Sequence, residues 1–193
     1  MFKTLIVILL SAVLVNNYVL RQFLGICPFL GVSKKLNQAV GMGVAVTFVM
    51  LLATAVTWPI QNFVLNSLNL GYLQTIVFIL VIASLVQLVE FYLKKSAPAL
   101  YSSMGVYLAL ITTNCAILAV TLNAISKNYN FLESIVYSLG SAGGFLLSMI
   151  LMSGIRKKMK SAPVPDFVKG TPILFVAAGL LSLAFGGFSG LIK

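Results

Sequence analysis

Six apolar stretches alternate with short polar segments along the whole chain. Each is about 20 residues long or longer, which is the length that an α-helix needs to cross a hydrocarbon core of about 30 Å. We therefore expect an all-α polytopic membrane protein that forms a single membrane domain over residues 1–193. The six predicted transmembrane helices cover residues 4–24, 38–58, 72–93, 99–122, 131–155 and 171–192.

A cysteine in a helix-breaking context follows the first predicted span. Cys27 lies between Gly25 and Gly31 and directly before Pro28, inside an apolar run. One continuous helix over residues 5–32 would be about 42 Å long, which exceeds the hydrocarbon core. Pro28 also removes a backbone donor, so we expect a break near Cys27 and a short helix with Pro28 in its first turn. Broken backbone at membrane depth is tolerated only where protein or a cavity covers it, so this break predicts a site.

The second cysteine, Cys115, lies in a similar setting, directly after Thr113 and Asn114. The two cysteines are 88 positions apart, which is close to half of the 193 residues. Because each half then holds three spans, an odd number, the second half is inverted relative to the first. The pattern predicts a 3+3 inverted repeat, about residues 1–95 and 96–193, in which helices 1 and 4 are broken near the midplane.

Basic residues indicate how the helices are oriented. Between spans 1 and 2, 3 and 4, and 5 and 6 lie Lys34, Lys35, Lys94, Lys95, Arg156, Lys157, Lys158, Lys160 and Lys169. The opposite side holds only Lys3, Lys127 and Lys193. Positive residues mark the cytoplasmic side, so we expect both termini on the outer side of the membrane.

The composition excludes several classes of function. Hydrophobic residues make up 60% of the chain and charged residues only 8%, far below the usual charged fraction of about 25% in soluble domains. The 13 basic residues lie mostly in short loops, so they report orientation and no nucleic-acid binding is expected. The chain has no histidine and only three acids, Glu90, Glu133 and Asp166, which makes a carboxylate-rich metal site or a Ser-His-Asp triad implausible.

Polar residues inside the predicted spans form a second group of candidates. Asn16, Asn17 and Arg21 lie on the first segment, and we expect them to face other helices or a cavity. They would either make hydrogen bonds between helices, with the side chain of Arg21 extending to the membrane–water interface, or lie beside a cofactor or an ion path. In the second element Asn114 is expected to cap a short helix that starts at Cys115, with help from Thr113.

Three functions remain open for two cysteines placed in this way. At a helix N-terminus each thiol would favour the thiolate form, which binds metal or attacks disulfides. An iron–sulfur cluster normally takes four thiolates, so a partner would have to supply two more. A disulfide between Cys27 and Cys115 in a thiol oxidoreductase is a second possibility, although the chain has no CxxC pair. A third is a non-redox transporter that uses Asn16, Asn17, Thr112, Thr113 and Asn114.

Three segments carry a resemblance to a known family: residues 24–35, 110–116 and 182–191. They closely resemble the A subunits of Rnf complexes, and the likeness covers essentially the whole chain. The same family includes the E subunit of the sodium-translocating NADH:quinone reductase, which stays an alternative assignment.

The resemblance implies six spans, an inverted repeat and a homologous sister subunit of opposite orientation, of the Rnf E type. It further implies that the two subunits share an intramembrane [2Fe–2S] cluster, with Cys27 and Cys115 as the ligands from this chain. The remaining partners would be the B, C, D and G subunits of Rnf, with ferredoxin and NAD at the level of the complex. Such a complex lies in the bacterial cytoplasmic membrane and couples electron transfer to sodium or proton translocation.

Overall fold

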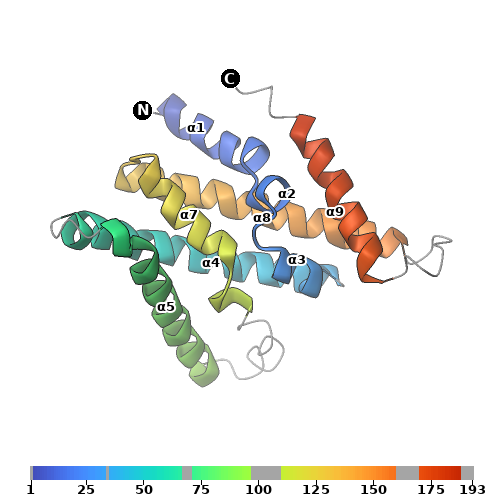
Figure 1. The fold of residues 1–193 in the computed structure, drawn as a ribbon. Helices are drawn as coiled ribbons and strands as arrows, with labels where there is room; N and C mark the ends of the chain where they lie inside the picture. Colours follow the sequence, from blue (N-terminus) through green and yellow to red (C-terminus); the bar gives the residue numbers. More distant parts are fainter. Residues whose placement is uncertain (1, 34, 67–70, 97–109, 160–169, 188–193) are drawn as a thin grey trace.

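The computed structural model describes residues 2–33, 35–66, 71–96, 110–159 and 170–187, and this part of the chain is helical without any strand (Figure 1). Its first half contains α1 (Phe2–Leu10), η1 (Ser11–Val15), α2 (Tyr18–Gln22), α3 (Ile26–Val32), α4 (Leu36–Ile60), η2 (Gln61–Leu65), η3 (Gly71–Leu73) and α5 (Gln74–Ser96). Its second half contains α7 (Cys115–Ser126), α8 (Phe131–Met159) and α9 (Thr171–Gly186).

Two long helices, α4 and α8, form the centre of the bundle and run side by side in opposite directions (Figure 1). At one end the rings of Trp58 and Phe131 meet edge to face, with centroids 5.4 Å apart. Nearer the other end Gly43 packs against the side chain of Leu146. The two contacts fix an antiparallel register, and Met50, Ala53, Ala142 and Met149 are fully buried along the pair.

The N-terminal segment crosses the opposite side of α8, where glycines allow a close approach. A Cβ atom at Gly140 would lie 2.9 Å from the carbonyl oxygen of Leu9 and 2.9 Å from the Cβ atom of Ala12. One turn further on, a Cβ at Gly144 would lie 3.1 Å from the carbonyl oxygen of Val13. Small residues at such contacts let helix backbones pack closely, as is typical inside membranes.

The first apolar segment is more fragmented than the sequence predicts. An unbroken helix over residues 4–24 is wrong, because the chain changes to π-helix at Ser11 and leaves the helix at Asn16 and Asn17 before α2 begins. The side chain of Asn17 accepts hydrogen bonds from the backbone N–H groups of Val19 and Leu20. An asparagine that satisfies these N–H groups starts a new helix inside an apolar run.

The second span also ends later than Trp58 and Pro59 suggest. Helical backbone continues through Pro59 to Leu65, because the N–H of Gln61 still bonds to the carbonyl oxygens of Thr57 and Trp58. Proline lacks only its own backbone N–H group. The turn that follows Pro59 forms π-helical hydrogen bonds, so the helix continues past the proline.

The helices confirm a multi-pass membrane protein. Among the described residues, three helical stretches are long and apolar enough to cross a bilayer: Leu36–Leu65, Gly71–Phe91 and Phe131–Met159. Three shorter apolar helices, Lys3–Val15, Leu110–Ser126 and Thr171–Gly186, fall on the first, fourth and sixth predicted spans. The remaining parts of the fourth and sixth spans, residues 99–109 and 188–192, lie outside the described residues.

The glycine contacts on α8 predict unequal effects of one substitution at two sites. Gly140→Ala should destabilise the protein by about 1–3 kcal/mol, because the new methyl group meets backbone that cannot turn away. Gly143→Ala on the same helix should have little effect, since its nearest contact would be 3.7 Å away, at Val13. Thermal unfolding in detergent measures both, and equal unfolding temperatures for the two variants would contradict this packing.

Candidate functional site

The site begins at the turn between α2 and α3, where two residues adopt left-handed backbone conformations. Phe23 has φ 54° and Gly25 has φ 79°. The N–H of Leu24 bonds back to the carbonyl oxygen of Tyr18 at 3.0 Å, which closes α2. The next helix, α3, starts at Ile26, so Cys27 is its second residue and Pro28 its third. Proline fits there because the first N–H groups of a helix have no helical partner, which confirms the predicted break and short helix.

Glycine is required at position 25 for two separate reasons. Its left-handed φ is unfavourable for residues with a side chain. A Cβ atom there would also lie 3.0 Å from the ring of Phe145 and 3.3 Å from both Ala116 and the Oδ1 atom of Asn114. Gly25 thus lets the start of α3 pack directly against α7 and α8.

The second cysteine opens a second short helix in the predicted way. Asn114 is the N-cap of α7, and its Oδ1 atom accepts a hydrogen bond of 3.0 Å from the N–H of Ala116. Cys115 is the first residue of that helix. Thr113 lies exposed in the turn before the cap. Both cysteines therefore lie in the first turn of a helix, where the helix dipole favours negative charge.

A direct contact joins the two breaks. The N–H of Gly25, the N-cap residue of α3, donates a hydrogen bond to Sγ of Cys115 at 2.8 Å. Residues that are 90 positions apart in the sequence thus place the start of α3 against the start of α7. Both cysteines are free thiols, and both are exposed on the surface of this chain.

The far end of α3 is fixed by a basic side chain. Nη1 of Arg156, near the end of α8, donates hydrogen bonds of 2.7 Å to the carbonyl oxygen of Leu30 and to Oγ of Ser33. A cation at a helix C-terminus is favourable because the last carbonyl oxygens lack helical partners. The sequence did not predict this role, because it assigned Arg156 to a basic loop after residue 155, whereas α8 continues to Met159 and brings Arg156 to α3.

Of the three polar residues predicted to face other helices or a cavity, Asn17 does face another helix, whereas Asn16 and Arg21 bond within the first segment. Nδ2 of Asn17 crosses to α8 and donates to the carbonyl oxygen of Gly144 at 2.8 Å and to Oγ of Ser148 at 2.9 Å. Asn16 makes a local bond of 3.1 Å to Oγ of Ser11. Arg21 lies exposed and donates to the carbonyl oxygen of Val15 at 3.2 Å.

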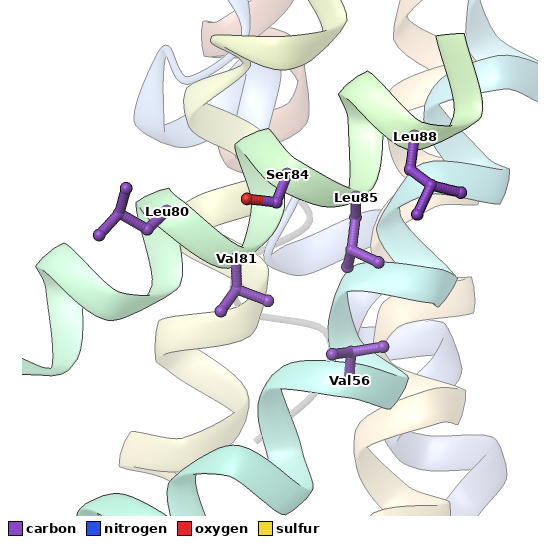
Figure 2. Close-up of a pocket in the computed structure, with 6 residues that line it drawn as sticks. All are labelled: Val56, Leu80, Val81, Ser84, Leu85 and Leu88. Carbon is purple, nitrogen blue, oxygen red and sulfur yellow. The ribbon is translucent and has the colours of Figure 1, made fainter. Parts of the chain in front are cut away.

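A surface groove lies apart from the cysteines, between α4 and α5 (Figure 2). Its lining consists of Val56, Leu80, Val81, Ser84, Leu85 and Leu88. Five of these six side chains are aliphatic, so the groove provides apolar surface and no group for catalysis or metal binding.

The thiols fit half of a metal or cluster site. Two exposed sulfur atoms at helix N-termini, one of which already accepts a backbone N–H bond, suit centres that thiolates bind, such as zinc or an iron–sulfur cluster. No set of three or more His, Cys, Asp or Glu side chains gathers among the described residues. A four-ligand centre at this position would therefore need ligands beyond these two thiols.

Comparisons with known proteins give a consistent picture. Residues 5–192 match the family model described as Rnf-Nqr subunit, membrane protein. The chain is 58% identical over 188 residues to the A subunit of a Na⁺-translocating ferredoxin:NAD⁺ oxidoreductase complex of Acetobacterium woodii, covering 97% of this chain and 98% of the relative. It is 52% identical over 184 residues to the A subunit of a proton-translocating ferredoxin:NAD⁺ oxidoreductase complex of Clostridium ljungdahlii, covering 95% of each chain. The A subunit of an ion-translocating oxidoreductase complex of Syntrophotalea carbinolica is 54% identical over 190 residues, which cover 98% of each chain.

The two neighbouring asparagines allow a matched test of the α2 start. Asn17→Ala should cost about 2 kcal/mol, since it removes a helix cap worth about 1 kcal/mol and the two hydrogen bonds that Asn17 donates to α8, which average about 0.6 kcal/mol each in membranes. Asn16→Ala should cost about 0.6 kcal/mol, because only one local bond is lost. Unfolding in a denaturing detergent series compares the two, and an Asn16 variant as unstable as the Asn17 variant would refute the assignment of the cap.

Proposed function

This chain belongs to the Rnf-Nqr family of membrane proteins, and we propose that it is an electron-transfer subunit of an ion-translocating ferredoxin:NAD⁺ oxidoreductase complex of the Rnf type. We expect no independent active site in this chain. The near-full-length likeness to A subunits of such complexes supports this assignment over the quinone-reductase alternative.

The observation that carries the proposal is the meeting of two helix N-termini, each with a cysteine in its first turn. Cys27 and Cys115 would hold one side of a [2Fe–2S] cluster. A homologous sister subunit of opposite orientation, of the Rnf E type, would supply the other two thiolates. Such a cluster, when bound, accepts and releases one electron at a time.

Other residues of the site stabilise the two cysteine-bearing helix starts. Gly25 provides an N–H to the sulfur of Cys115, and such bonds stabilise negative charge on sulfur. Asn114 keeps the start of α7 in place, and Arg156 holds the far end of α3. Arg21 has no contact with the cysteines in the structure, so a role in offsetting the charge of a cluster stays a prediction.

We further propose six spans arranged as two inverted halves, in the bacterial cytoplasmic membrane, with both termini outside. The antiparallel α4–α8 pair and the meeting of the α3 and α7 N-termini are the relations that an inverted repeat requires. The bond from Arg156 to Ser33 brings two of the basic loops to one end of the bundle. The remaining partners would be the B, C, D and G subunits of Rnf, with ferredoxin and NAD bound elsewhere in the complex.

Serine variants test the cluster assignment. Cys27→Ser and Cys115→Ser should insert and assemble normally, because serine is close in size to cysteine. Each should lose the electron paramagnetic resonance (EPR) signal of the shared cluster, since serine is a poor ligand for iron, and ferredoxin-dependent NAD⁺ reduction should fall to background. Met42→Leu is the control, because it changes a buried side chain on α4 with little change in volume. A serine variant that keeps both signal and activity would eliminate that cysteine as a ligand.

Labelling of introduced cysteines tests the orientation. Asn66→Cys, after η2, should react with an impermeant maleimide added to intact cells, whereas Lys158→Cys, at the end of α8, should react only after the membrane is opened. The unmodified chain measures the background from the two native thiols. The opposite labelling pattern would place the termini inside.

A further inference from the structure

We propose that the end of α2, residues 21–23, is the surface on which the sister subunit docks, with Phe23 as its apolar anchor and Arg21 as its polar anchor. The inference rests on the proposed function and deepens it, because it assigns the recognition surface beside the thiols. The residues concerned are not ligands of the proposed cluster.

The turn between α2 and α3 lies at the middle of a membrane-spanning helix. A Cβ atom at Gly25 would lie 3.0 Å from the ring of Phe145. Phe145 is the central residue of α8, 14 residues after Phe131 and 14 before Met159, and α8 is long and apolar enough to cross a bilayer. The turn is therefore about 21 Å from either end of α8, at a depth where lipid offers no hydrogen bonds.

Polar side chains lie on the surface of the chain around this turn. Arg21 and Gln22 end α2 and are exposed, as are Thr113 and both thiols. Charged and polar side chains inside a membrane rarely face lipid, because lipid satisfies none of their hydrogen bonds. This argues that another protein, rather than lipid, covers the surface in the membrane.

Arg21 keeps hydrogen-bond donors available for that partner. Its side chain makes one hydrogen bond to the described residues, from Nη1 to the carbonyl oxygen of Val15 at 3.2 Å. A guanidinium group has five N–H donors, so the others can bind a carboxylate or helix-end carbonyl oxygens of a second chain.

Phe23 is held in an unfavourable backbone conformation with its side chain on the surface. It is the C-cap of α2, its φ is 54°, and its side chain is 48% exposed. Helices that close in this left-handed conformation usually do so with glycine, because a Cβ atom is unfavourable there. Since packing within this chain covers only about half of the side chain, the strained position points to a function outside the chain.

The rest of α2 is fixed against two other helices. The hydroxyl group of Tyr18 shares a hydrogen bond with that of Tyr137 on α8 and accepts one of 3.0 Å from Nδ2 of Asn123 on α7. Asn17 bonds to α8 at the start of the same helix. The exposed end of α2 is thus held in place before a partner arrives, which lowers the entropic cost of docking.

Phe23 also lies close to the thiols. Two residues separate it from Gly25, so their Cα atoms are about 7 Å apart or less, and the N–H of Gly25 donates to Sγ of Cys115 at 2.8 Å. Cys27 follows Gly25 by two residues in the first turn of α3. A partner that places its thiolates beside these two cysteines would therefore also cover Phe23. Aromatic and arginine side chains that become buried at the centre of an interface contribute most of its binding energy.

Glycine at position 23 separates docking from folding. Phe23→Gly relieves the left-handed backbone, so the purified chain should unfold at a temperature no lower than that of the unmodified chain. In the complete complex, purified through a tag on this chain, the same variant should recover about tenfold less sister subunit and lose the cluster EPR signal in proportion. Arg21→Gln keeps a polar side chain without the charge and should lower the recovery in the same direction.

Asn128→Gly is the matched control. Asn128 is the other non-glycine residue with a positive φ among those described, at 52°, and it lies exposed in the turn before α8. Its replacement relieves the same kind of backbone away from the thiols and should leave the recovery of the sister unchanged. Full recovery with an unchanged cluster signal in Phe23→Gly would overturn the inference.

A photoreactive benzoylphenylalanine in place of Phe23 tests the contact itself. In the complete complex, illumination should link this chain to the sister subunit, whereas adducts with lipid alone would overturn the inference. A wild-type complex that lacks the sister or the cluster signal would instead contradict the proposed function, so the two failures are distinguishable.

Discussion

The structure depends on how backbone N–H groups are satisfied where helices begin inside an apolar bundle. The first N–H groups of any helix lack helical partners, and lipid offers none. Two of the three internal starts use an asparagine side chain as the cap, and the third uses a cysteine sulfur. Asn17 caps α2 with its side chain, Asn114 caps α7, and the N–H of Gly25 at the start of α3 finds the sulfur of Cys115. The last bond makes a thiol part of the backbone pairing, which ties the site to the fold.

The long helix α8 supports the starts of α2 and α3. It provides Gly144 and Ser148 to Asn17, Phe145 against Gly25, and Arg156 to the end of α3. Glycines on the same helix let the N-terminal segment approach closely enough for those contacts to form. A single long helix thus contacts both the segment that carries Cys27 and the start of α3 that donates to Cys115.

The residues next to each cysteine were enough to predict where the cysteine-bearing helices begin. Glycine and proline around Cys27 predicted the start of α3, and asparagine before Cys115 predicted the start of α7. The break at Asn17 was not predicted, because an asparagine in an apolar run is equally compatible with a hydrogen bond between helices. Here Asn17 both caps α2 and bonds to α8. The contacts of Arg156 and Tyr18 join residues more than 100 positions apart, so no pattern within one segment could indicate them.

The central claim is that Cys27 and Cys115 face one centre shared with a second subunit. A cryo-electron microscopy map of the intact complex tests it most directly. We expect compact two-iron density at the subunit boundary, joined to the sulfur atoms of both cysteines and to two sulfur atoms of the sister chain. Lipid or apolar side chains covering both thiols, with no metal density between the subunits, would contradict it.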